Sequence, residues 1–156
     1  MGQEIERRFL LAGTIPIPEN FEKFKIHQAY ILVDKGKQVR IRLTKNKAVI
    51  GIKFTTSIVR AEFEYEVPLK DGKEIYKHCK WSLEKKRLSF SVGKEHYDVD
   101  DYPNGLVVVE VEFKSLKDMK KWKKPSWLGL EITGVRKYSN ITLSKKNLKF
   151  KRGNKS

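Results

Sequence analysis

The feature of this sequence that most restricts its fold is an alternation that places charged side chains of one sign on the same face of a strand. In "VEVEF", Glu110 and Glu112 fall on one face of an extended chain, and Val109, Val111 and Phe113 fall on the other. A period of two residues is typical of a β-strand with one apolar and one polar face. The sequence therefore predicts a mainly β protein.

The same pattern returns along the chain, and the signs are kept apart by strand. Arg40 and Arg42 share a face in "QVRIRL", whereas Glu62, Glu64 and Glu66 share one in "RAEFEYEVP". For any one strand, a solvated face of an antiparallel sheet is an alternative explanation. Like charges placed side by side repel, however, so repeated segregation costs stability unless a group of opposite charge lies between them. The pattern indicates a highly charged ligand.

The predicted elements are many short strands and few helices. Turn signals such as Asp34-Lys-Gly36 and Pro103-Asn-Gly105 separate the strands. About eight antiparallel strands in one small domain favour a barrel or a strongly curled sheet, whose charged faces would line a tunnel. Strands are predicted at 3–10, 28–33, 38–44, 48–55, 60–67, 82–91, 94–99 and 106–113, with an extended piece near 130–133. Helices are predicted at 19–25, 71–79, from the capping box at Ser115 to Pro125, and at 140–148.

Length and composition predict one soluble domain. The 156 residues suffice for a single domain, predicted over 1–150 with a basic, frayed tail at 151–156. Cys79 is the only cysteine, which excludes an intramolecular disulfide, and no apolar signal or membrane-spanning run occurs. A cytoplasmic protein without a membrane association is expected. The net charge of +15 indicates a polyanionic partner.

The two kinds of charged strand suggest what that partner contains. Clustered carboxylates supply the hard oxygen ligands that Mg²⁺ or Mn²⁺ prefers, and clustered Arg and Lys side chains supply donors for phosphate oxygens. Both requirements meet in a complex of a divalent metal with a polyphosphate. Phosphoryl transfer depends mainly on positioning and charge neutralisation, so such a cage of charges is suited to catalyse it.

The N-terminal segment Glu4-Ile-Glu6-Arg-Arg8 resembles the Glu-x-Glu-x-Lys motif of the CYTH superfamily, the triphosphate tunnel metalloenzymes. The segments "VRIR", "IGIKF", "RAEFEYEVP", "EKKR", "GLVVVEVEF" and "KYSN" follow in the order that this family shows. The resemblance covers roughly residues 3–143. Within the superfamily, the chain is most similar to the bacterial-type inorganic triphosphatases.

The resemblance implies an eight-stranded antiparallel β-barrel that encloses a charged tunnel, with a few short helices outside it and at the C-terminus. It implies that a triphosphate is held by Arg8, Arg40, Arg42, Lys53, Lys85, Arg87 and Lys137. It implies that one or two ions of Mg²⁺ or Mn²⁺ are held by Glu4, Glu6, Asp100, Glu110 and Glu112. The catalytic residues that it implies are Tyr30 and Lys53, with Glu62 and Glu64 on the acidic wall.

Three positions depart from the family pattern. Arg8 stands where the motif has lysine, and Lys137 stands where the family has an arginine before the late tyrosine. Arginine offers a planar fork and lysine a compact point charge, so each exchange keeps the charge and alters the geometry. Val135 stands where relatives often have an acidic residue.

The resulting hypothesis is a metal-dependent enzyme that hydrolyses inorganic triphosphate or another small triphosphate and releases phosphate. The alternatives are an activity like that of the class IV adenylate cyclases, a thiamine triphosphatase, and a non-catalytic protein that binds a nucleotide or polyphosphate. A nucleic-acid-binding module is less favoured, because the basic composition comes without a reading motif. Whether the chain forms a homodimer stays open.

Overall fold

The structure is a computed structural model that describes residues 2–55 and 59–151. Its described strands and helices follow the alternation of the sequence closely. The strands are β1 (Gly2–Leu11), β2 (Glu22–Asp34), β3 (Lys37–Leu43), β4 (Ala48–Thr55), β5 (Val59–Val67), β6 (Trp81–Val92), β7 (Glu95–Asp101), β8 (Val107–Glu112) and β9 (Leu128–Glu131). The helices are α1 (Leu69–Lys77), α2 (Leu116–Lys121), the 3₁₀ turn η1 (Arg136–Tyr138) and α3 (Asn140–Lys145).

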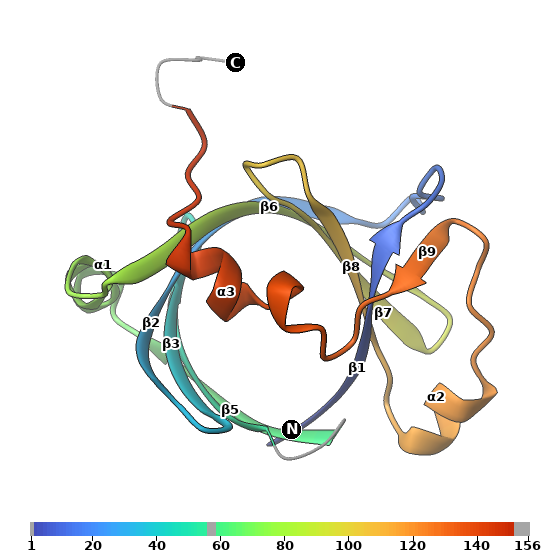
Figure 1. Cartoon of the computed structure of the whole chain (residues 1–156), viewed down its shortest axis with the longest axis horizontal. Coiled ribbons are helices and arrows are strands. Elements are labelled where there is room, and N and C mark those ends of the chain that lie inside the picture. Colours follow the sequence, from blue (N-terminus) through green and yellow to red (C-terminus); the bar gives the residue numbers. More distant parts are fainter. Residues whose placement is uncertain (1, 56–58, 152–156) are drawn as a thin grey trace.

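The strands form a closed ring, seen end-on in Figure 1. The sheet runs in the order β5-β4-β3-β2-β6-β7-β8-β1-β9, and β5 also pairs with β1. That second pairing is antiparallel and places residues 2–5 opposite residues 59–62, which closes eight strands on themselves. The predicted antiparallel barrel is therefore confirmed, and β9 extends the sheet beyond the ring by pairing with β1.

The apolar faces of the strands point outward, where helices and loops cover many of their side chains, whereas Phe54 of β4 and Phe63 and Tyr65 of β5 stay exposed. Ile5, Phe9 and Val111 belong to a buried cluster on the outside of the ring, and the partly buried Met119 and Trp122 of the α2 region pack against it. A second cluster, around β3 and β4, packs against α1. Since burial of apolar surface is the main stabilising contribution in folding, this barrel is stabilised from its outside. Its inside is left for the charged faces.

One predicted helix is wrong. Residues 19–25 were expected to be helical, but β2 begins at Glu22 and pairs with β6, with Glu22 opposite Ser89 and Lys23 opposite Leu88. Pairing with a neighbouring strand outweighs local propensity here, as tertiary context often does. The other three predicted helices are present. In α2 the Ser115 hydroxyl accepts from the backbone N–H of Asp118 at 3.0 Å, as the capping box predicts, but the helix ends at Lys121 rather than continuing to Pro125.

The segment that contains η1 and α3 lies across one end of the ring in Figure 1 and contributes to the wall of the cavity inside it. It is fixed by hydrogen bonds to the barrel. The Tyr102 hydroxyl donates to Oδ1 of Asn140 at 2.6 Å, and Nη1 of Arg8 donates to the Tyr138 carbonyl at 2.8 Å. The C-terminal helix therefore belongs to the site as well as to the fold.

Two further expectations concern the ends of the chain and membranes. Of the predicted tail at 151–156, only Lys151 lies within the described residues. Among the helices of the described residues, none has the length and apolar character needed to cross a membrane.

Candidate active site

The interior of the ring holds a cavity of about 320 Å³ with charged walls. Every residue for which the sequence predicts a catalytic, phosphate-binding or metal-binding role lines this cavity except Lys85, Asp100 and Lys137. The predicted residues that the structure brings together are Glu4, Glu6, Arg8, Tyr30, Arg40, Arg42, Lys53, Glu62, Glu64, Arg87, Glu110 and Glu112.

The register of the ring places cations opposite carboxylates. Arg8 of β1 lies across from Glu110 of β8, and Lys53 of β4 lies across from Glu62 of β5. Directly opposite side chains of an antiparallel pair are close enough to interact. Nε of Arg8 lies 3.3 Å from Oε2 of Glu110, and Nζ of Lys53 lies 3.5 Å from Oε2 of Glu62. The segregated strands therefore meet as ion pairs once the barrel closes.

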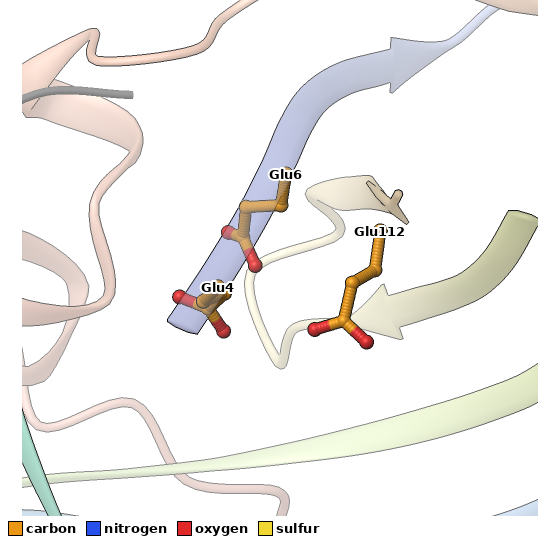
Figure 2. A group of neighbouring side chains, drawn as sticks. All are labelled: Glu4, Glu6 and Glu112. Carbon is orange, nitrogen blue, oxygen red and sulfur yellow. The ribbon is translucent and has the colours of Figure 1, made fainter. Parts of the chain in front are cut away.

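Three carboxylates gather at one place on the wall. Glu4 and Glu6 of β1 and Glu112 of β8 each offer an oxygen, and these oxygens lie within 4.8 Å of one another. Figure 2 shows the three side chains turned toward a common space. Burial, reinforced by Glu110 and Glu4, raises the pKa of Glu6 to about 8. Burial and the neighbouring carboxylates therefore disfavour the charged form of Glu6, and a divalent cation would offset that cost.

This donor set fits Mg²⁺ or Mn²⁺. Both ions prefer oxygen ligands, and Mg²⁺ in particular is bound through one or two carboxylates together with phosphate oxygens of a substrate. Glu4 and Glu6 are buried and Glu112 is exposed, so the group lies at the boundary between the wall and the open part of the cavity. Glu110, which the sequence also predicts as a metal ligand, lies outside this group and contacts Arg8 and Arg87.

The arginines on the cavity wall include buried donors without partners, and neighbouring positive charges crowd around Arg42. Nε and Nη2 of Arg8 are buried without a hydrogen-bond partner within the described residues. Withdrawal from water, together with Arg40 and Arg87, lowers the pKa of Arg42 to about 10. Buried donors without acceptors are costly, and an anion in the cavity would satisfy them. The wall is therefore suited to hold phosphate oxygens.

Asp100 and Lys85 are not among the residues that line the cavity, although each lies two residues from a lining residue on its strand. Both are fully buried, and Nζ of Lys85 lies 2.8 Å from Oδ2 of Asp100. Although burial alone would raise it, Arg87 and Lys85 hold the pKa of Asp100 well below its usual range. The carboxylate of Asp100 is thus occupied by two cations of the chain, and it is not a member of the group of three carboxylates.

Lys137 also lies away from the cavity wall. Its ammonium lies 4.9 Å from the centre of the Tyr138 ring, whereas the preceding residue, Arg136, lines the cavity. The 3₁₀ turn decides which of the two neighbouring basic residues faces inward. Their sequence, Arg-Lys, could have raised Arg136 as a candidate, but it could not decide between them.

The predicted catalytic pair, Tyr30 and Lys53, lines the cavity, each residue with its own partners. Nζ of Lys53 donates to Oε1 of Glu4 at 3.1 Å, and the Tyr30 hydroxyl accepts from Nε2 of Gln28 at 3.3 Å. Lys53 therefore links the acidic group on β1 to Glu62 on β5.

Sequence reasoning missed Arg60. This residue of β5 lines the cavity, and its Nη1 lies 3.5 Å from Oε2 of Glu6 and 3.7 Å from Oε1 of Glu4. Its position two residues before Glu62 gives it the same parity along the strand, which was the signal that could have identified it.

The comparisons with known proteins agree with this geometry. No protein-family model matches the chain. A protein named inorganic triphosphatase from Acetivibrio thermocellus is 36% identical over 152 residues, which cover 93% of this chain and 95% of the relative. The chain belongs to the inorganic triphosphatase family. A second inorganic triphosphatase, from Nitrosomonas europaea, is 26% identical over 147 residues, which cover 90% of this chain and 96% of that protein.

A solved structure of this family shares the fold. The crystal structure of the inorganic triphosphatase NE1496 superimposes with a TM-score of 0.64 at 25% identity, covering 91% of this chain and 94% of that one. The resemblance of the sequence to the CYTH superfamily is in keeping with this family. Within it, Arg8 departs from the motif lysine in a way that the structure makes concrete, because its guanidinium spans from Glu110 to the Tyr138 carbonyl.

Proposed function

We propose that this protein hydrolyses inorganic triphosphate to phosphate and diphosphate with the help of Mg²⁺ or Mn²⁺. The observation that carries the proposal is the closed ring whose cavity is lined by a group of three carboxylates together with Lys53 and several arginines. The activity named for its relatives supports the same reaction.

The basic residues would hold the substrate. Arg8, Arg40 and Arg42 present guanidinium groups to the cavity, and such groups pair with phosphate oxygens through two parallel hydrogen bonds. Lys53 lies between the carboxylates of Glu4 and Glu62, where it would bring a further positive charge next to the bound anion. Because these donors are held by the ring before the substrate binds, little reorganisation is needed when charge develops.

The acidic residues would hold the metal and the attacking water. Glu4, Glu6 and Glu112 are the residues that would bind the divalent cation, which as a Lewis acid would withdraw charge from a phosphate oxygen. Glu62 and Glu64 lie near Arg40 on the cavity wall and can accept a hydrogen bond from a water that attacks a terminal phosphorus. The oxygen of that water joins the phosphorus as the bond to the bridging oxygen breaks.

The cavity also favours a small substrate. Among its described lining residues, Tyr30 is the one large aromatic side chain, and the remainder of the wall is dominated by charge. A purine or thiazole ring is usually held by stacking on aromatic or apolar side chains. Inorganic triphosphate makes no such demand, so it matches the wall better than ATP or thiamine triphosphate.

A single assay tests the proposal. The protein is incubated with inorganic triphosphate, ATP or thiamine triphosphate, in the presence of Mg²⁺, Mn²⁺ or EDTA, and the products are identified by phosphate release and chromatography. We expect phosphate and diphosphate from inorganic triphosphate, with turnover abolished by EDTA. Cyclic AMP and diphosphate from ATP would instead indicate a cyclase. Tight binding without turnover of any substrate would indicate a non-catalytic binder and would refute the proposal.

A further inference from the structure

Arg60 occupies the seam where the barrel closes. It lies directly opposite Glu4 in the pairing of β1 with β5, and both side chains face the inside of the ring. Its guanidinium reaches the carboxylates of both Glu4 and Glu6. Among the ion pairs of the described residues, Glu6 takes part in one, and its partner there is Arg60.

The contacts of Arg60 are looser than those of a fixed structural ion pair. Its distances to the two carboxylates, 3.5 and 3.7 Å, exceed hydrogen-bond length, whereas Arg87 donates to Asp100 at 2.7 and 2.9 Å. Its Nε is buried and has no hydrogen-bond partner within the described residues. Arg60 therefore neutralises the carboxylates without being locked onto them, and its side chain borders open cavity into which it can move.

Lys53 is the other cation next to these carboxylates, and it is held differently. It donates a hydrogen bond to Glu4 at 3.1 Å and also pairs with Glu62, so it bridges two walls of the ring. Lys53 also acts electrostatically on Glu6, but the guanidinium of Arg60 is the group that lies within ion-pair distance of both Glu4 and Glu6. These are two of the three residues that fit a divalent metal.

We propose that Arg60 is a counter-cation of the carboxyl pair formed by Glu4 and Glu6 in the metal-free protein, and that it sets the affinity for the divalent cation by competing with it for that pair. This inference rests on the proposed function in one respect, namely that the metal binds at Glu4, Glu6 and Glu112. A guanidinium and a divalent cation next to the same carboxylates repel each other, so the metal binds more weakly while Arg60 is in place. Arg60 is a positioning residue in this scheme, because it acts through the carboxylates.

The test measures metal binding without substrate. Mn²⁺ is titrated calorimetrically into the full chain and into Arg60→Gln, which removes the charge. We expect Arg60→Gln to bind Mn²⁺ on the order of tenfold more tightly, from the Coulomb repulsion that it relieves. It should also melt at a lower temperature without metal and gain more thermal stability from added Mn²⁺, because its carboxylates lose one of their two internal cations. Arg60→Lys keeps the charge and should bind Mn²⁺ with nearly the affinity of the unchanged protein.

Arg7→Gln is the matched control. Arg7 lies on β1 and pairs with Glu131 away from the cavity, so this variant removes the same charge without touching the carboxylate group. Its affinity for Mn²⁺ should be unchanged. If Arg60→Gln does not fold, Arg60→Met, which is also neutral, replaces it.

The outcomes separate the two proposals. Mn²⁺ binding by the unchanged protein, with equal or weaker binding by the neutral Arg60 variants, overturns the role of Arg60 and leaves the proposed function standing. Failure of the unchanged protein to bind Mn²⁺ or Mg²⁺ overturns both.

Discussion

Arg87 donates two hydrogen bonds to Asp100 inside the barrel, from Nε at 2.7 Å and from Nη2 at 2.9 Å. Lys85 adds a third cationic contact to the same carboxylate. Asp100 thus fixes two of the basic residues that the sequence predicts as phosphate ligands, and in the structure it serves as their anchor.

The anchor gives the first prediction. Asp100→Asn should lower the free energy of unfolding by about 3–5 kcal/mol, because it leaves two buried cations with one partner fewer. Urea denaturation followed by circular dichroism measures this change. Asp101→Asn is the control, since Asp101 is the next residue of β7 and is exposed. Unchanged stability of Asp100→Asn, combined with loss of metal binding, would instead make Asp100 a metal ligand.

Two glutamates of β8 give the second prediction. Glu112 belongs to the group of three carboxylates, whereas Glu110 is engaged with Arg8 and Arg87. Glu112→Gln should therefore weaken Mn²⁺ binding more than Glu110→Gln does, by roughly tenfold or more, as the loss of one charged oxygen ligand implies. Calorimetric titration of the two variants compares them directly. Equal losses would place both carboxylates in the metal site, as the sequence predicts.

Arg8→Lys, which restores the motif of the family, gives the third prediction. Lysine keeps the charge, but its single ammonium is not a fork that can span from Glu110 to the Tyr138 carbonyl. We expect a folded protein whose kcat/KM for inorganic triphosphate falls about tenfold, because a charge-assisted hydrogen bond contributes about 1.5–3 kcal/mol. Arg7→Lys, on the opposite face of the same strand, should leave kcat/KM unchanged. A higher kcat/KM in Arg8→Lys would show that arginine at this position limits the enzyme.

The ion pair of Arg7 and Glu131, on the outside of the barrel, predicts how stability depends on pH. Hydrogen bonds from Arg7 at 2.9 and 2.6 Å lower the pKa of Glu131 in the folded protein. A lowered folded-state pKa stabilises the protein above the unfolded-state value near 4.3, and this stability is lost as pH falls through the folded-state value. Because both side chains are partly exposed, we expect a coupling energy of only about 0.5 kcal/mol at pH 7 and none near pH 2. A double-mutant cycle of Arg7→Gln and Glu131→Gln, measured at the two pH values, tests this, and a coupling that persists in acid would contradict it.

Much of the barrel and of its lining could be predicted from the alternation of the sequence. A period of two residues assigns each side chain to a face, so Arg40 and Arg42 of β3 share the cavity wall as expected. The alternation also runs through Lys23, Phe24, Lys25 and Ile26, but it is short there, and the pairing of Glu22 and Lys23 with β6, far along the chain, decides that this stretch is a strand. Local propensity contains no information about such a distant partner.

The missed and displaced site residues share one physical cause. Parity along a strand tells which face a residue occupies, and it does not tell which residue lies across from it. The engagement of Asp100 by Arg87 depends on the register of β6 with β7, and the position of Arg60 next to Glu4 depends on the closure of β5 onto β1. The position of Arg136, rather than Lys137, on the cavity wall depends on the course of a 3₁₀ turn. Neither the two-residue period of a strand nor the period of an α-helix applies there.

The closure of the ring also sets the order of events during synthesis of the chain. Among the described strands, β1 leaves the ribosome before the others, but its neighbours in the ring are β5 and β8, and the latter ends at Glu112. The backbone groups of residues 6–10 must wait until β8 has been made, and such non-local pairing is slow. The charges of Glu4, Glu6 and Arg8 keep this waiting segment hydrated and oppose its pairing with other nascent chains. The residues proposed for catalysis would then also protect the newborn protein from aggregation.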